Sequence, residues 1–226
     1  MDGAVTSAAM QLVLHAGLAA ATVLPPAAAA APELVVLVRH GHKDVPVEGR
    51  NNFNLSETGL LQALRLSHLL PACLVPQRRL HLASYGFDHA TGKNARSYQT
   101  LVPLAVATGV DIRLYPEADH RSEQIGRQLL ADPALSGGVL VVAWEHRRLP
   151  LLARGLGWTQ MPRIDDDDFD RIWLLRYRPS VPTPEVSQLS QASLLQQDCF
   201  RTAPAGGHPL QRLAEQLIES LRPGPR

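Results

Sequence analysis

The segment Leu34-Val-Val-Leu-Val38 most constrains what this chain can fold into, because it is an unbroken apolar run. Three of its five residues are β-branched, which is typical of a strand. A strand without alternating polar residues is buried on both faces, as in a parallel sheet covered by helices. A second run of this kind, Val139 to Ala143, follows two glycines. The two runs predict central strands of one such sheet.

Weaker patterns predict helices and strands that alternate along the rest of the chain. Ser56 is a suitable N-cap for a helix that extends to Leu70. The leucines on the predicted buried face of that helix are Leu60, Leu61, Leu64 and Leu69. The other predicted elements are helices over residues 94–108, 122–130, 147–156 and 209–221, and strands over residues 80–84, 112–115 and 172–177. Prolines between residues 179 and 184 predict irregular structure there.

This alternation predicts an α/β fold, a three-layer α/β/α sandwich with a mostly parallel central sheet. The length of 226 residues fits one such domain, which we expect over residues 33–226, after a leader over residues 1–32. The net charge of +1 gives no field of one sign. We therefore expect no nucleic acid and no membrane surface as the main partner.

The leader supports two interpretations of where the protein resides. The uncharged stretch from Met10 to Leu24 and the small residues at Ala29–Ala31 are typical of a signal peptide, which would direct the protein to the periplasm or outside the cell. No lysine or arginine precedes this stretch, which favours a disordered leader on a cytoplasmic enzyme instead. The Pro25-Pro26 pair interrupts the apolar stretch and argues against stable membrane insertion.

Two cysteines, Cys73 and Cys199, form no CxxC or metal-binding pattern. Cysteine is often buried as a free thiol, and we expect that state for both. A disulfide between them would require an oxidising compartment.

Ionisable residues follow the two strongest predicted strands directly. Arg39 and His40 come after the first strand, and Glu145 and His146 come after the second. Ligands bind beyond the carboxyl ends of parallel strands, so we expect the two histidines to share one pocket. Arg96 lies near the start of the helix predicted over residues 94–108, whose N-terminus carries partial positive charge. Guanidinium, imidazole and helix amide groups together suit a phosphoryl dianion.

Four ordered blocks between residues 34 and 157 resemble the histidine phosphatase superfamily, whose fold is called phosphoglycerate-mutase-like. The blocks are Arg39-His40-Gly41, the segment Asn54 to Ala63, Ser84 with Ala95 to Thr100, and the segment Val139 to His146. The resemblance implies a phosphoric monoester hydrolase that forms a phosphohistidine on His40, without cofactor or metal. It also implies that Arg39, Arg96 and His146 bind the phosphate oxygens. The expected substrate is a small phosphorylated molecule or a phosphoprotein.

The sequence departs from the pattern of the superfamily at the residue expected to act as general acid. Some members place an aspartate directly after the second histidine, where this chain has Arg147. Glu145, which precedes that histidine, is the first candidate for the acid, and Glu117 is the second.

Two other functions stay open at this point. A chain without an effective acid could be a non-catalytic phosphate-binding member of the fold. His40 and His42 resemble the metal-binding pair of a metal-dependent hydrolase, although that barrel needs about 250 residues. The acidic run Asp165 to Asp168, with Asp170, lacks the spacing and the glycine of a calcium loop, and we expect a solvated surface there.

Overall fold

The computed structural model describes residues 31–44, 52–74, 79–116, 119–179, 181, 183–194, 196 and 216. Most of the predicted leader and all of the predicted helix over residues 209–221 except Gln216 lie outside these residues. Within the described part, no helix has the length and apolar character needed to cross a membrane.

A single six-stranded sheet forms the centre of the domain, in the order β3-β2-β4-β1-β5-β6. The strands are β1 Leu34–Arg39, β2 Leu80–Tyr85, β3 Ile112–Tyr115, β4 Val139–Trp144, β5 Arg171–Arg176 and β6 Glu185–Ser190. Strands β1 to β4 are parallel where they pair, whereas β5 runs antiparallel to both β1 and β6. The prediction of a mostly parallel central sheet is therefore confirmed.

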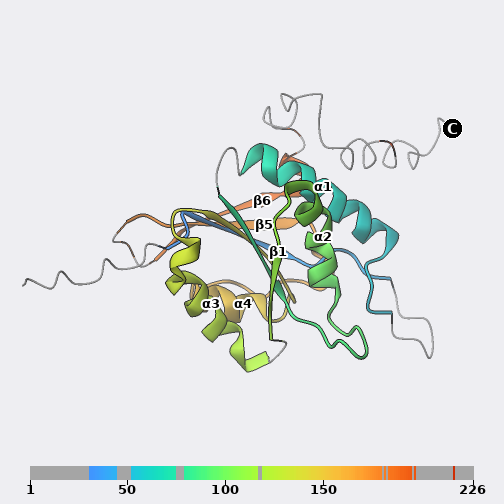
Figure 1. The fold of residues 1–226 in the computed structure, drawn as a ribbon, viewed down its shortest axis with the longest axis horizontal. Helices are drawn as coiled ribbons and strands as arrows, with labels where there is room; N and C mark the ends of the chain where they lie inside the picture. Colours follow the sequence, from blue (N-terminus) through green and yellow to red (C-terminus); the bar gives the residue numbers. More distant parts are fainter. Residues whose placement is uncertain are drawn as a thin grey trace, which may run out of the picture.

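Helices cover both faces of the sheet, which gives the predicted three layers (Figure 1). The helices are α1 Glu57–Cys73, α2 Arg96–Thr108, α3 Ser122–Ala131, α4 Leu149–Gly155 and α5 Gln191–Leu194, with 3-10 turns at Asp119–Arg121 and Pro133–Leu135. Helices α1, α2 and α5 pack against one face, and α3 and α4 against the other.

The apolar runs of the sequence supply the core on both sides. Every residue of β1 and of β4 is buried. Val35 and Leu37 of β1 face the α3–α4 layer, whereas Leu34, Val36 and Val38 face the α1–α2 layer. A strand covered on both faces has no polar alternation, which is why these two strands are visible in the sequence.

The structure differs from the prediction at one edge of the sheet and on one helix. Strand β6 was not predicted, because four of the six residues in its sequence EVSQLS are polar and its edge position leaves it largely exposed. The antiparallel direction of β5 was also not predicted. Leu60, expected in the core, is 50% exposed, because the buried face of α1 centres on Ala63, Leu66 and Leu70 instead.

The expectation of a free thiol is wrong for Cys73, which is disulfide-bonded at the end of α1. The second cysteine of the chain, Cys199, lies outside the described residues.

The first turn of α1 packs tightly against the chain that leaves β1. Ser56 caps the helix by accepting a hydrogen bond from the Gly59 amide, and the Ser56 amide donates to the His42 carbonyl at 3.0 Å. A Cβ atom at Gly59 would lie 2.2 Å from that carbonyl oxygen. Only glycine fits there without moving backbone, so this contact fixes where α1 begins relative to the segment after β1.

We predict that Gly59→Ala lowers the free energy of unfolding by about 1–3 kcal/mol, because the added methyl group overpacks a backbone contact. The matched control is Leu60→Ala, one residue along the same helix and half exposed, which should change it by less than about 0.5 kcal/mol. Urea unfolding of both variants measures the difference. Equal stability of the two variants would contradict the close approach.

Candidate functional site

The pairing of β1 with β4 brings the two predicted histidines together. Arg39 stands opposite Trp144 in the register of the two strands, and the His40 amide donates to the Trp144 carbonyl at 3.3 Å. The chain therefore leaves both strands at the same edge of the sheet. The His40 and His146 rings lie with their centroids 5.7 Å apart, and both residues are buried. The convergence expected from the strand order is present.

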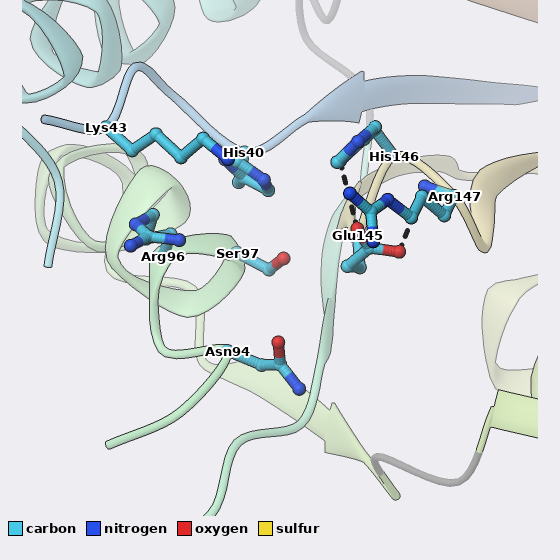
Figure 2. A pocket seen from close by; sticks show the side chains of 8 residues that line it. All are labelled: His40, Lys43, Asn94, Arg96, Ser97, Glu145, His146 and Arg147. Atoms are coloured by element: carbon cyan, nitrogen blue, oxygen red, sulfur yellow. Dashed lines mark hydrogen bonds and ion pairs between the residues drawn. The ribbon is translucent and has the colours of Figure 1, made fainter. Parts of the chain in front are cut away.

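A cavity of about 150 Å³ opens beside these rings, with a largely polar wall (Figure 2). By the volume one water needs, it has room for several water molecules and for a phosphoryl group. The residues that line it are His40, Lys43, Asn94, Arg96, Ser97, Glu145, His146 and Arg147. Three of these carry permanent positive charge and one is a carboxylate, so the cavity favours an anion.

The environment of His40 keeps its ring neutral and leaves one ring nitrogen with a free lone pair. Its Nδ1 atom lies 2.9 Å from the carbonyl oxygen of Gly41. A carbonyl only accepts, so Nδ1 carries the proton and Nε2 keeps its lone pair. Burial lowers the pKa of His40 to about 3, and the charges of Arg39, His146 and Arg96 act in the same direction, while the Gly41 hydrogen bond opposes them. His40 is therefore neutral across the physiological pH range.

Helix α2 is tied to the segment after β1 and holds Arg96 at the cavity. Thr100 Oγ1 accepts from the Gly41 amide at 2.9 Å and donates to the Arg96 carbonyl at 2.7 Å. The Arg96 guanidinium donates through Nε to the Asn54 carbonyl at 2.9 Å and through Nη2 to the Asn52 carbonyl. These two bonds fix one side of the guanidinium and leave Nη1 for the cavity. No side chain caps the N-terminus of α2, so its first amides stay available.

His146 lies between two carboxylates. Its Nε2 atom is 2.8 Å from Asp166 Oδ1, a hydrogen bond, and its Nδ1 atom is 2.9 Å from Glu145 Oε1. The second contact has the distance of an ion pair but not the angle of a hydrogen bond, so within the described structure the buried Nδ1 has no hydrogen-bond partner. Glu145 also accepts from the Arg147 amide at 2.9 Å (Figure 2).

The surroundings of Glu145 favour its ionised form. Burial by itself raises the pKa of this carboxyl. The contact with His146 and the Arg147 amide outweigh burial and lower the pKa below its ordinary value. Glu145 is therefore a carboxylate at neutral pH.

Arg39, predicted as a phosphate ligand, lies beside the cavity and not in its wall. Its Nη1 atom donates to the carbonyls of Asp165 at 2.9 Å and Asp168 at 3.0 Å, and Nη2 donates to the carbonyl of Asp166 at 2.9 Å. The guanidinium carbon sits 3.7 Å above the centre of the Phe169 ring. Its buried Nε atom alone has no partner in the part of the chain that the structure describes.

The acidic run is consequently more than the solvated surface that we expected. Its carboxylates are mostly exposed, but Arg39 binds its backbone and His146 binds the side chain of Asp166. Sequence analysis missed this contact because it depends on β5, the antiparallel strand that begins directly after the acidic run and lies beside β1. Lys43, Asn94 and Ser97 also line the cavity, and Ser97 lies in the block Ala95 to Thr100 that carries the resemblance.

His42 does not line the cavity. Glu117 lies outside the described residues. The His42 ring stacks on Phe169 with centroids 4.0 Å apart, and its amide donates to Gln62 Oε1 at 3.2 Å. Among the residues that the structure describes, no group of three or more His, Cys, Asp or Glu side chains is placed to hold a metal ion.

Neither a protein-family model nor a curated protein sequence matches the chain. It is similar to a solved structure from Agrobacterium tumefaciens assigned as the phosphohistidine phosphatase SixA, with 20% identity, a TM-score of 0.48 and coverage of 70% of this chain and 98% of that one. A SixA protein histidine phosphatase complexed with tungstate has 13% identity, a TM-score of 0.45 and coverage of 71% and 99%. Phosphoglycerate mutase from Bacillus anthracis has 10% identity, a TM-score of 0.46 and coverage of 75% and 97%.

With identities of 20% or less and TM-scores below 0.5, these similarities do not establish a function. The function is therefore inferred from the side chains at the sheet edge.

Because His40 is buried and neutral, we predict that the free energy of unfolding falls in acid. Its pKa is about 3 in the folded protein and about 6.5 in the unfolded chain, so between these values only the unfolded chain binds the proton. Stability therefore falls as the pH drops from about 6.5 toward 3, by at most about 1.4 kcal/mol per pH unit from this residue. His40→Gln should remove that contribution. Urea unfolding of both proteins at pH 7, 5.5 and 4.5 tests this, and parallel pH dependences would contradict it.

Proposed function

We propose that this chain hydrolyses phosphate monoesters through a phosphohistidine formed on His40. The main support is the state of that residue: it is neutral, its Nδ1–H is held by the Gly41 carbonyl, and it lines a basic cavity. A nucleophile and an anion-binding site in one cavity are the two parts that phosphoryl transfer requires.

The phosphoryl oxygens would be bound by groups that already face the cavity. Arg96 offers Nη1, and His146 offers the Nδ1 atom that has no hydrogen-bond partner among the described residues. The start of α2, at Arg96 and Ser97, adds amides and partial positive charge. Arg39 contributes its charge and its buried Nε from beside the cavity. Fixed donors around a developing charge supply most of the catalysis in reactions of this class.

In the first step, the Nε2 lone pair of His40 attacks phosphorus and the phosphorus–oxygen bond to the leaving group breaks. The leaving oxygen takes a proton from Glu145, the acid of this proposal. The surroundings of Glu145 keep it ionised in the free protein, but a phosphate dianion bound beside it raises its pKa by charge repulsion, so the carboxylate takes up a proton from solvent. Substrate binding thus creates the acid that the step needs.

In the second step, water attacks the phosphorus of phosphohistidine and the phosphorus–nitrogen bond breaks. The Glu145 carboxylate takes the proton of the water, phosphate leaves, and His40 regains its Nε2 lone pair. The Nδ1–H stays on the Gly41 carbonyl throughout, so only Nε2 changes its bonding.

We predict that His40→Ala lowers turnover of p-nitrophenyl phosphate below about one thousandth of the wild-type value, because a nucleophile is lost. Acid quenching with labelled substrate should trap phosphoenzyme on the wild-type protein and none on the variant. His81→Gln is the matched control: this histidine lies near the start of β2, at the opposite edge of the sheet, so both measurements should be unchanged.

Two outcomes of the same experiment would replace the proposal. Turnover that EDTA abolishes would identify a metal-dependent hydrolase. Phosphate binding without any turnover of p-nitrophenyl phosphate, whose leaving group hardly needs an acid, would identify a non-catalytic binding protein.

We predict that Glu145→Gln lowers turnover of an alkyl phosphate by about 100-fold or more and that of p-nitrophenyl phosphate by far less, because only the alkyl leaving group needs a proton donor. Glu123→Gln is the matched control, since this glutamate pairs with Arg127 on α3 and does not line the cavity. Equal losses on both substrates would remove Glu145 from the acid role.

A further inference from the structure

We propose that Asp166 is a positioning residue: its carboxylate holds the His146 ring by Nε2 so that Nδ1–H is directed at the bound phosphoryl group. This inference rests on the proposed function, because it takes His146 as a phosphate ligand. It also gives a function to the acidic run before β5, which no sequence motif explained.

The two ring nitrogens of His146 have different partners. Nε2 donates to Asp166 Oδ1 at 2.8 Å, and Asp166 is not part of the cavity wall. Nδ1 lies near Glu145, which is in the wall, but has no hydrogen-bond partner in the described part of the chain although the side chain is only 5% exposed. A phosphate oxygen could accept the well-aligned hydrogen bond that the Glu145 contact does not provide. The geometry thus assigns Nε2 to the protein and Nδ1 to the ligand.

The Asp166 carboxylate is held in place although its side chain is 63% exposed. Arg39 donates to the backbone carbonyls of residues 165, 166 and 168 and lies over the Phe169 ring. The Phe169 carbonyl in turn accepts from Gln62 and, at 3.1 Å, from Gln191. The backbone on both sides of Asp166 is therefore fixed by β1, α1 and α5. Arg39 acts here through the acidic run and not only through its own charge.

Both ring nitrogens of His146 lie next to carboxylate oxygens. The groups that face it are the carboxylates of Asp166 and Glu145 and the neutral ring of His40. The hydrogen bond and charge of His146 lower the pKa of Asp166, and Arg147 and Arg163 lower it further, so this carboxylate stays ionised. With Nε2 donating to Asp166 and Nδ1 directed at phosphate, both ring nitrogens of His146 act as donors in this proposal.

The decisive variant is Asp166→Asn, which keeps the size of the side chain and removes its charge. Its matched control is Asp167→Asn, the next residue, which is exposed and carries the same charge. We measure the affinity of the full chain for inorganic phosphate by calorimetry from pH 6 to pH 9. We expect Asp166→Asn to weaken binding by about tenfold or more, as for other lost charge-assisted bonds. The pH above which affinity falls should also move down, while Asp167→Asn should stay within about twofold of the wild type.

Two results would overturn the assignment. Tighter phosphate binding by Asp166→Asn would mean that the carboxylate competes with phosphate for His146. Equal affinities and equal pH profiles for the two variants would mean that Asp166 does not act on the site. Thermal unfolding of both variants checks that they remain folded.

The two proposals can fail separately. A wild-type protein that binds phosphate but never turns over p-nitrophenyl phosphate contradicts the proposed function and leaves the comparison of the two aspartates intact. A wild-type protein that turns over the substrate, with Asp166→Asn unchanged in phosphate affinity, contradicts the positioning role alone.

Discussion

The parallel pairing of β1 with β4 is the constraint on which the site depends. Both strands are buried along their whole length, and the pairing is held by apolar side chains and backbone hydrogen bonds. The register sets Arg39 opposite Trp144, so His40 and the Glu145-His146 pair leave the sheet side by side. A slip of one residue would turn the side chains of a strand to the opposite face, which the two-sided core does not allow. The strand packing that stabilises the core therefore also sets the geometry of the cavity.

The two histidines at this edge have opposite electrostatic environments. His40 is buried beside a carbonyl and near positive charges, which keeps it neutral. His146 is equally buried but lies between two carboxylates. Pairs of titratable groups whose surroundings differ in this way commonly divide the roles in catalysis. In the mechanism proposed above, the neutral ring is the nucleophile and the ring between carboxylates is the anion ligand.

The elements that could be predicted from sequence are those whose burial leaves a periodic pattern. Strands β1 and β4 are uninterrupted apolar runs because both faces are covered, and helix α1 begins at the predicted N-cap Ser56. Strand β6 left no such pattern, because an edge strand with a mostly polar sequence resembles a loop. Leu60 was misplaced for a related reason: α1 carries so many leucines that their spacing fits more than one buried face.

The sequence by itself determined which ionisable residues follow the two central strands. A residue directly after a buried strand lies at the end of that strand, because the strand fixes its place. It thereby determined that two histidines meet at one edge of a mostly parallel sheet. Only the tertiary structure decided the partners of those residues. Arg39 binds backbone carbonyls 126 to 129 positions away, and His146 binds a carboxylate in a run that looked like a solvated surface. Backbone carbonyls occur at every residue, so no residue type marks them, and they become ligands only when β5 packs beside β1.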